Sequence, residues 1–326
     1  PVQFEAVPGY GVLLHAQVNA AGEGAPIVLM GHMDTVFPAG TVAKRPYREE
    51  AGRAYGPGVA DMKSGLVLNV FVAEDFARCG GLKAPLHLFF SCDEEIGSPV
   101  TRDLIMARVR GARAVFNAEP GRVSGNVVTS RKGSMLVEFE VEGVAAHAGI
   151  NHAAGASAIE ALARKTLALH ALTDPATGVT ANVGVVHGGV VSNMVAPHAR
   201  AELDLRFTAD TNPEDLLARV RAIIEEESVP RTQGRITVAR STLPMKPTPD
   251  YLLALYQESA RTLGFEVQGE FTGGAADSGL TASVGVPTLC ATGPVGGHPH
   301  TEREYCELTT FVPRAQAVAL AVLGHP

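Results

Sequence analysis

Five short polar clusters in this 326-residue chain carry side chains that bind metal ions or move protons, and they occupy residues 31–36, 56–65, 93–98, 117–120 and 298–304. Four of them directly follow a predicted buried strand, and ligands of open α/β sheets bind at that edge. Singly, each has an ordinary explanation, such as a helix N-cap for Asp61 or a turn for Glu119. Together they offer carboxylates and imidazoles without a thiolate, which suits hard or borderline divalent cations, with Zn²⁺ first.

The number of donors indicates two metal ions. Five side chains are candidate donors, more than a single catalytic zinc uses. They are the His of residues 31–36, Asp61, one acid of 93–95, Glu119 and one of His298 and His300. A pair of metals about 3.5–4 Å apart, bridged by a carboxylate and a water, accounts for all five. The adjacent acids at 93–95 can divide the work between metal ligand and general base.

The elements that must position these clusters alternate between strands and helices. Strands are predicted at 8–18, 26–31, 85–91, 112–117 and 286–292, and helices at 63–78, 101–109, 248–263 and 311–323. This alternation predicts an α/β domain with a largely parallel central sheet, formed by residues 1–130 and 242–326.

Residues 131–241 have a different pattern and read as an inserted domain. Strands are predicted at 134–142, 179–188, 199–207 and 235–241, with helices at 155–171 and from Asn212 to about 227. The order β-α-β-β-α-β is that of a ferredoxin-like α+β unit. The alternation of apolar residues in its strands predicts a sheet with one covered and one open face.

The overall composition excludes several classes of protein. The formal charge of −7 argues against a nucleic-acid binder, whose surface is basic. No apolar stretch is long enough to span a membrane. Four cysteines without a CxxC pair fit a reduced cytoplasm. The chain opens at Pro1 without a signal-like segment, so we expect a cytoplasmic protein whose native N-terminus lies upstream, and secretion stays open.

The chain resembles the zinc-dependent exopeptidase and amidohydrolase family of glutamate carboxypeptidase, aminoacylase, acetylornithine deacetylase and succinyl-diaminopimelate desuccinylase. The resemblance rests on runs that occur in family order, namely GHMDTVFPAG, AYGPGVADMKSG, SCDEEIGS, NAEPG, AAHAG, VVSN, DLRF, TGGAADSG and HPHTEREY. The stretch 31–65 is most similar to the glutamate carboxypeptidase branch. The family usually begins with a helical segment before the strand predicted at 8–18, and this chain lacks it.

The resemblance implies a role for each candidate ligand. His32 and Glu119 would bind one zinc, Glu95 and His300 the other, and Asp61 would bridge them. The cofactors would be two Zn²⁺ per subunit, with Mn²⁺ or Co²⁺ as alternatives. His300 fits the family's HxxxE spacing, which makes His298 the weaker candidate.

The resemblance also implies the catalytic groups around the metals. Glu94 would be the general base, and Asp34 would orient His32. The peptide bond between Asp61 and Met62 would be cis.

The inserted domain would be the family's lid and dimerisation domain, so the resemblance implies a homodimer formed through residues 131–241. His147 would hydrogen-bond the tetrahedral oxyanion in its own site or in that of the partner subunit. Asn193 and Arg206 would hold the terminal carboxylate of the substrate. Gly273 and Gly274 would bring backbone groups close to it, although the following residues depart from the threonine and aspartate of the glutamate carboxypeptidase pattern.

The sequence therefore predicts an enzyme, a co-catalytic zinc metallopeptidase. It would hydrolyse an amide bond next to a free carboxylate and release a C-terminal amino acid from a dipeptide or related small molecule. The alternative from the same family is an N-acyl-amino-acid deacylase of the aminoacylase or acetylornithine deacetylase type. A non-catalytic metal-dependent binding protein and a two-metal phosphoesterase are weaker alternatives, the latter because no phosphate-cradling loop is evident.

Overall fold

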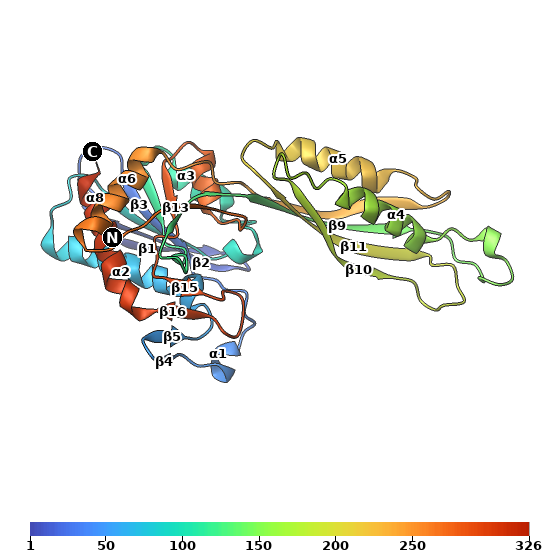
Figure 1. The fold of residues 1–326 in the computed structure, drawn as a ribbon, viewed down its shortest axis with the longest axis horizontal. Helices are drawn as coiled ribbons and strands as arrows, with labels where there is room; N and C mark the ends of the chain where they lie inside the picture. Colours follow the sequence, from blue (N-terminus) through green and yellow to red (C-terminus); the bar gives the residue numbers. More distant parts are fainter. Residues whose placement is uncertain (326) are drawn as a thin grey trace. The chain divides into compact units, whose positions relative to one another are not determined.

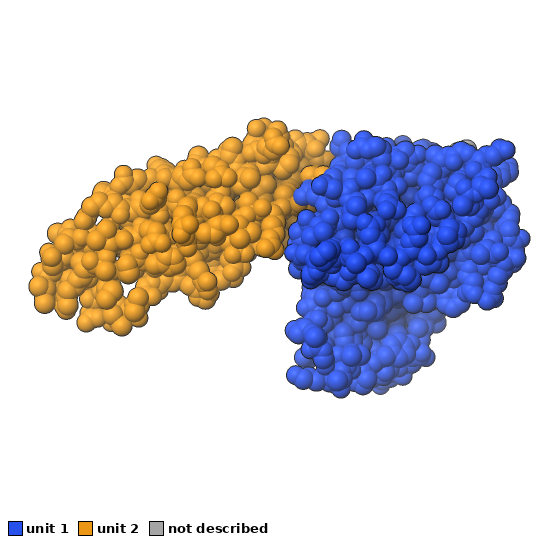
Figure 2. Space-filling model, turned by 180° about the vertical axis from the view of Figure 1, so that it is seen from behind, with its two compact units in different colours: residues 1–131, 245–326 blue, residues 132–244 orange. Residues whose placement is uncertain are grey.

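A computed structural model describes residues 1–325, and in it the chain divides into two units (Figures 1 and 2). Unit 1 combines residues 1–131 with the chain from residue 245 onward, and unit 2 comprises residues 132–244. Each unit has its own cluster of buried hydrophobic side chains. Within residues 1–325, no helix is long and apolar enough to cross a membrane.

The main sheet of unit 1 has eight strands in the order β1-β2-β6-β3-β7-β14-β8-β13. Strand β3 lies parallel to both β6 and β7, and β14 lies parallel to β7, so these four central strands end at the same edge. The prediction of a largely parallel centre is confirmed, while the β1–β2, β2–β6 and β14–β8 pairs are antiparallel. The strand bounds are β1 Val2–Val7, β2 Gly11–Val18, β3 Ile27–His32, β6 Leu86–Ser91, β7 Ala114–Asn117, β8 Val127–Arg131, β13 Gly269–Thr272 and β14 Thr288–Cys290.

Helices cover the central sheet. The main hydrophobic cluster joins strands β3, β6 and β7 to three helices, α2 Ser64–Cys79, α6 Asp250–Thr262 and α8 Phe311–Gly324. Every residue of β3 is buried, as expected for a strand covered on both faces. Two further helices, α3 Arg102–Val109 and α7 Ser278–Ser283, pack against each other.

A second, smaller sheet in unit 1 was not expected from the sequence. Its order is β15-β16-β5-β4, and no strand in it exceeds three residues. Such strands are too short to produce a readable hydrophobic period. The bounds are β4 Arg48–Glu50, β5 Arg53–Tyr55, β15 Gly296–Gly297 and β16 Tyr305–Glu307, with the one-turn helix α1 Thr41–Lys44 just before β4.

Unit 2 has the expected β-α-β-β-α-β order. Its sheet, β10-β11-β9-β12, pairs all neighbours antiparallel, as in a ferredoxin-like fold. Burial alternates along β9, and the buried residues join α4 and α5 in one core, so one face of the sheet is covered. The bounds are β9 Gly133–Glu142, α4 Ala158–His170, β10 Thr180–Gly188, β11 His198–Phe207, α5 Pro213–Glu225 and β12 Gln233–Thr242.

Local hydrogen bonds explain where these helices begin. Asn212 caps α5 as predicted, because its side chain accepts from the backbone N–H of Glu214 at 2.9 Å. The helix predicted from residue 155 begins only at Ala158. The reason is that Ser157 is extended and its hydroxyl accepts the N–H of Glu160, which makes Ser157 the N-cap.

Candidate metal centre

The edge where the central strands end brings the predicted donors together. His32 is the last residue of β3, the acids at 93–95 follow β6, and Glu119 follows β7. Asp61 lies in an irregular helical turn, residues 59–63, directly before α2, and His300 lies in the loop between β15 and β16. Parallel strands therefore supply three of the clusters, and two loops supply the rest.

Asp61 lies at the centre of this cluster. Its Oδ1 is 3.2 Å from Nε2 of His32, and its Oδ2 is 3.2 Å from Nε2 of His300. Each oxygen thus faces a different imidazole, which is the arrangement a bridging carboxylate requires. The His32 ring is also 3.8 Å from Oε1 of Glu119, and the His300 ring is 3.2 Å from Oε2 of Glu95. These two groups match the two ligand sets that the resemblance implies.

The spacing and chemistry of these donors fit divalent metal ions. Two ligands bound to one tetrahedral zinc at about 2.0–2.2 Å lie about 3.3–3.6 Å apart. Donor atoms of His32, Asp61 and Glu95 all lie within 4.8 Å of one another. Within the described chain, the buried Oε1 of Glu95 has no hydrogen-bond partner, so it needs a further positive or donating group.

The electrostatics of the metal-free cluster show the same need for positive charge. Burial raises the pKa of Glu119 to about 7 and raises that of Glu94 well above its usual range. Hydrogen bonds to Asp61 and Glu95 raise the pKa of His300 to about 10. Burial alone would lower the pKa of His32, but its bonds to Asp34 and Asp61 raise it well above its ordinary value. Protonated imidazoles and neutral acids thus compensate the crowded carboxylates.

Glu94 lies beside the donors without belonging to either pair. Its Oε2 is 3.9 Å from Nε2 of His32, and its side chain is 14% exposed. A carboxylate at this distance can contact a water held between the donors, and its raised pKa suits a group that must both accept and return a proton.

Asp34 orients His32 and also contacts the next cluster. Nδ1 of His32 is 3.1 Å from the backbone oxygen of Asp34 and 3.4 Å from its Oδ1. This assigns the proton to Nδ1 and leaves Nε2 available to a metal. The sequence did not predict the second contact, in which the N–H of Glu95 donates to Oδ2 of Asp34 at 3.0 Å.

Glu304 supports the Asp61 turn. It is 1% exposed and accepts three backbone N–H groups, from Gly58 at 2.9 Å, Ala60 at 2.9 Å and Asp61 at 3.0 Å. The Asp61–Met62 peptide bond is cis, as the resemblance implied. Gly65, the second residue of α2, packs against the backbone just after β7, where a Cβ would lie 1.9 Å from the carbonyl oxygen of Ala118. This close approach brings Asp61 next to Glu119.

Two further charged residues were not predicted as part of the site. Asp277, 2% exposed, accepts the hydroxyls of Ser91 and Ser98. Arg131, 9% exposed, donates Nε to Sγ of Cys290 at 3.3 Å and Nη1 to the Gly274 oxygen at 3.0 Å. The family's HxxxE spacing pointed to Glu304, but no sequence pattern marks Asp277 and Arg131 as buried.

The predicted glycine pair has a partner in unit 1. Gly273 and Gly274 are both exposed, and the bond from Arg131 fixes the Gly274 carbonyl. The loop can therefore present backbone groups while a buried guanidinium anchors it.

The other predicted substrate groups all lie in unit 2. His147 is exposed, and its Nδ1 accepts the backbone N–H groups of Gly149 and Ile150 at 3.1 and 3.2 Å. Nδ1 is therefore unprotonated in the neutral ring, and Nε2 carries the proton. Asn193 is a neighbour, because its backbone oxygen accepts the N–H of Ala148 at 2.9 Å.

Arg206 lies on the open face of the unit 2 sheet, as expected. Its Nε and Nη2 both donate to the carboxylate of Asp204 at 2.8 Å. In the register of the sheet Arg206 is opposite Ser134, at the start of β9, whereas His147 follows the end of that strand. Unit 2 therefore keeps His147 with Asn193 and separates both from Arg206.

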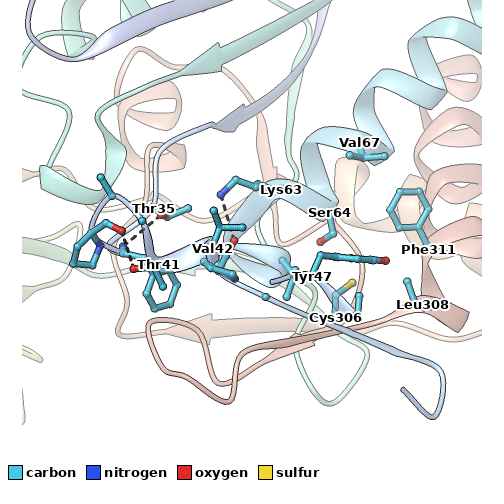
Figure 3. A pocket seen from close by; sticks show the side chains of 18 residues that line it. Thr35, Thr41, Val42, Tyr47, Lys63, Ser64, Val67, Cys306, Leu308 and Phe311 are labelled. Carbon is cyan, nitrogen blue, oxygen red and sulfur yellow. Dashed lines mark hydrogen bonds between the residues drawn. The ribbon is translucent and has the colours of Figure 1, made fainter. Parts of the chain in front are cut away.

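Unit 1 also contains an apolar pocket of about 600 Å³, shown in Figure 3. Phe37, Val42 and Tyr47 line it together with Val67 of α2 and Phe311 of α8. None of the candidate metal donors lines it. Val59 and Lys63, the two ends of the turn that carries Asp61, do line it, so the pocket adjoins that turn.

Comparisons with known proteins agree with this geometry. The sequence profile of the peptidase family M20/M25/M40 matches residues 28–324. Carboxypeptidase G2 of Pseudomonas sp. is 28% identical over 309 residues, which are 92% of this chain and 74% of that protein. A succinyl-diaminopimelate desuccinylase of Leptothrix cholodnii is 26% identical, over 90% of this chain and 80% of its own length.

A solved structure shares the fold. The M20 family metallo-carboxypeptidase Sso-CP2 of Sulfolobus solfataricus superposes with a TM-score of 0.83 at 18% identity, over 100% of this chain and 90% of that one. The profile match extends over both units and includes every candidate ligand. The chain therefore belongs to the peptidase family M20/M25/M40, a family of metal-dependent hydrolases of amide bonds.

Proposed function

We propose that this chain is a two-zinc carboxypeptidase or dipeptidase that hydrolyses the amide bond next to a free carboxylate and releases a C-terminal amino acid. One observation carries the proposal. The two oxygens of Asp61 face the imidazoles of His32 and His300, each 3.2 Å away, and Glu94 lies beside them. This arrangement would give two adjacent metal positions with a carboxylate base alongside.

The ligands divide into two sets around Asp61. His32 with Glu119 would hold one Zn²⁺, and Glu95 with His300 would hold the other. When bound, the two ions polarise the scissile carbonyl and lower the pKa of water toward neutrality. Asp34 keeps His32 in the tautomer that leaves Nε2 free, which the 3.1 Å contact at Nδ1 supports.

Glu94 would carry the proton. It accepts a proton from the attacking water and later donates it to the nitrogen of the leaving amine. In the metal-free protein, burial raises the pKa of this side chain above its usual range, which makes it a stronger base toward the attacking water.

Three groups of unit 2 would complete the site. His147 donates from Nε2 to the developing oxyanion, and its tautomer is already fixed by two backbone N–H groups at Nδ1. Arg206 would exchange Asp204 for the terminal carboxylate of the substrate, because its planar fork binds both in the same bidentate way. Asn193, a neighbour of His147, would add a hydrogen bond to the same substrate group from the other subunit.

The length of unit 2 supports a homodimer. Strand β9 has 10 residues and so spans about 30 Å between the Arg206 end and the His147 end. Two groups that far apart do not meet at one small substrate within a single chain. We therefore propose that Arg206 and His147 act in the sites of different subunits of a homodimer.

A deacylase of N-acyl amino acids is the second candidate. The 26% identity to a succinyl-diaminopimelate desuccinylase over 90% of this chain favours it. Both activities use the same metals, base and carboxylate-binding groups. They differ in whether an amino acid or an acyl group lies on the carbonyl side of the bond.

A mass-spectrometric screen of dipeptides and N-acyl amino acids tests the proposal. The purified chain would be loaded with Zn²⁺, Mn²⁺ or Co²⁺ in parallel, and Glu94→Gln would be compared with the exposed control Glu302→Gln. We expect Glu94→Gln to retain two metals per chain and to lose about 10³-fold or more in kcat. Full turnover by Glu94→Gln would disprove its role as base, and no hydrolysis by the wild type would reject the enzyme.

A further inference from the structure

The segment that carries Glu94 and Glu95 is closed at both ends by one buried carboxylate. Ser91 is the last residue of β6, and Ser98 follows the one-turn helix Glu94–Ile96. The hydroxyl of Ser91 donates to Oδ2 of Asp277 at 2.9 Å, and the hydroxyl of Ser98 donates to Oδ1. Asp277 comes from a distant part of the sequence, directly before α7, so these bonds tie the segment to another element.

Both serines need this partner. Ser91 is completely buried and Ser98 is 1% exposed, so neither hydroxyl has access to bulk water. Ser98 also has a φ of 51°, in the left-handed region that non-glycine residues seldom occupy. The bond to Asp277 helps hold the chain in this conformation, at the point where it turns from the acids toward α3.

The backbone between the two serines has few other fixed points. The N–H of Gly97 donates to the Glu94 oxygen at 2.8 Å, and that of Ser98 donates to the Asp93 oxygen at 2.8 Å. The Asp93 side chain is turned away from the donors and accepts N–H groups of Val100 and Thr101. Glu95 also contacts Asp34 and His300, and Glu94 lies 3.9 Å from His32. The two ends of the segment add to these contacts in orienting both acids.

We propose that Asp277 is a positioning residue that fixes residues 92–97, so that Glu95 faces a metal while Glu94 faces the water. The inference rests on the function proposed above. Because one carboxylate accepts a hydrogen bond from each end of the segment, it fixes the distance between those two ends. Loss of either bond frees the turn and moves both acids together.

The test must separate positioning from general stability. The variants are Asp277→Asn, Ser98→Ala and Ser91→Ala, together with the combined triple variant. Leu252→Ala is the control, because this completely buried side chain of α6 lies in the hydrophobic cluster of unit 1, to which no candidate donor belongs. Each variant is measured for melting temperature, for kcat and KM on the best substrate of the wild type, and for Zn²⁺ affinity by calorimetry.

We expect Asp277→Asn to lower kcat by about 30-fold or more with KM changed by less than about threefold. We expect one of two Zn²⁺ ions to bind about 10–100-fold more weakly, the usual effect of losing a group that orients a ligand. Leu252→Ala should lower the melting temperature at least as much while keeping kcat and both affinities. In the triple variant the losses should not add, because all three residues act through the same two bonds.

The proposal fails if Asp277→Asn keeps the wild-type kcat and both Zn²⁺ affinities, or if Leu252→Ala reproduces its effects. It also fails if the losses multiply in the triple variant. Should Asp277→Asn not fold, Ser98→Ala is read by the same criteria. If the wild type hydrolyses nothing, the proposed function is rejected, and the Zn²⁺ titration alone still decides whether Asp277 positions Glu95.

Discussion

Replacing Glu304 by glutamine tests whether the Asp61 turn depends on a buried acceptor. Oε2 of Glu304 accepts the backbone N–H of Gly58, and its Oε1 accepts the backbone N–H groups of Ala60 and Asp61. Glutamine has one acceptor oxygen. It can keep two of these bonds, but its NH₂ group then faces the third N–H, donor against donor.

The cost can be worked out from these contacts. One buried N–H loses its acceptor, which costs about 1–3 kcal/mol, and the two remaining bonds lose their charge assistance, about 0.5–1 kcal/mol each. We therefore expect Glu304→Gln to destabilise metal-free unit 1 by about 2–5 kcal/mol. The alanine variant would orphan all three N–H groups, about 3–9 kcal/mol in sum, which approaches the whole stability of a domain.

Tyrosine fluorescence reports this change for unit 1 alone. The chain has six tyrosines and no tryptophan, and residues 132–244 contain no tyrosine. Urea unfolding in the presence of a chelator, followed by this signal, gives the free energy of unfolding of unit 1. Glu302→Gln is the matched control, because Glu302 is exposed and lies two residues away. It should shift stability by less than about 0.5 kcal/mol.

The same variant should weaken metal binding, because the N–H of Asp61 is one of the three donors. We expect a loss of about 10–100-fold in Zn²⁺ affinity, measured by calorimetry. If Glu304→Gln unfolds at the same urea concentration as Glu302→Gln and binds Zn²⁺ equally well, Glu304 does not support the turn.

Three further predictions concern other groups of the site. Mixing Glu94→Ala and His147→Ala subunits should restore activity that neither variant has alone. If His147 acts across the dimer, the mixed dimer contains one intact site. No recovery on subunit exchange would place His147 in the site of its own subunit. Arg206→Lys should raise KM about tenfold or more with kcat nearly unchanged, because lysine cannot bind a carboxylate in bidentate fashion, and an unchanged KM would contradict that role. Burial raises the pKa of Glu119 from 4.5 to about 7, so its contribution to the stability of the metal-free protein is complete below pH 4.5 and is lost as the pH rises to about 7. Glu119→Gln should flatten urea midpoints across this window, and parallel curves would disprove the assignment.

Three of the five clusters of candidate donors could be placed from the sequence, because their positions follow from strand order. A buried apolar run marks β3, β6 and β7, and the polar residue after each run must lie at the shared edge. The choice between Glu94 and Glu95, and between His298 and His300, could not be made from spacing and came from the family resemblance. The unit 2 fold was also predictable, since β9 and β11 alternate cleanly.

The supporting roles of Glu304 and Asp277 could not be predicted, although the family's HxxxE spacing pointed to Glu304, because both residues lie beside elements too short to show a period. Glu304 directly precedes β16, a strand of three residues, and Asp277 precedes α7, a helix of six. Arg131 ends β8, where a charged side chain is ordinarily exposed, yet it is buried against Cys290 and the Gly274 carbonyl. Burial of a charge depends on partners that are far away in the sequence.

The nature of these supports has a consequence for folding. Loops at the strand ends present N–H and O–H donors, and an ionised carboxylate is the strongest acceptor for them. The acceptors here are Asp34, Asp277 and Glu304. Each of them adds a negative charge to a site that already holds the donor carboxylates. Arg131 is a buried cation nearby. Bound cations offset this repulsion in the folded state only, so they stabilise unit 1 by mass action, by about 4 kcal/mol at a thousand times Kd. We therefore expect Zn²⁺ to raise the unfolding midpoint reported by the tyrosines of unit 1, and to leave unchanged any separate transition of unit 2 seen by circular dichroism.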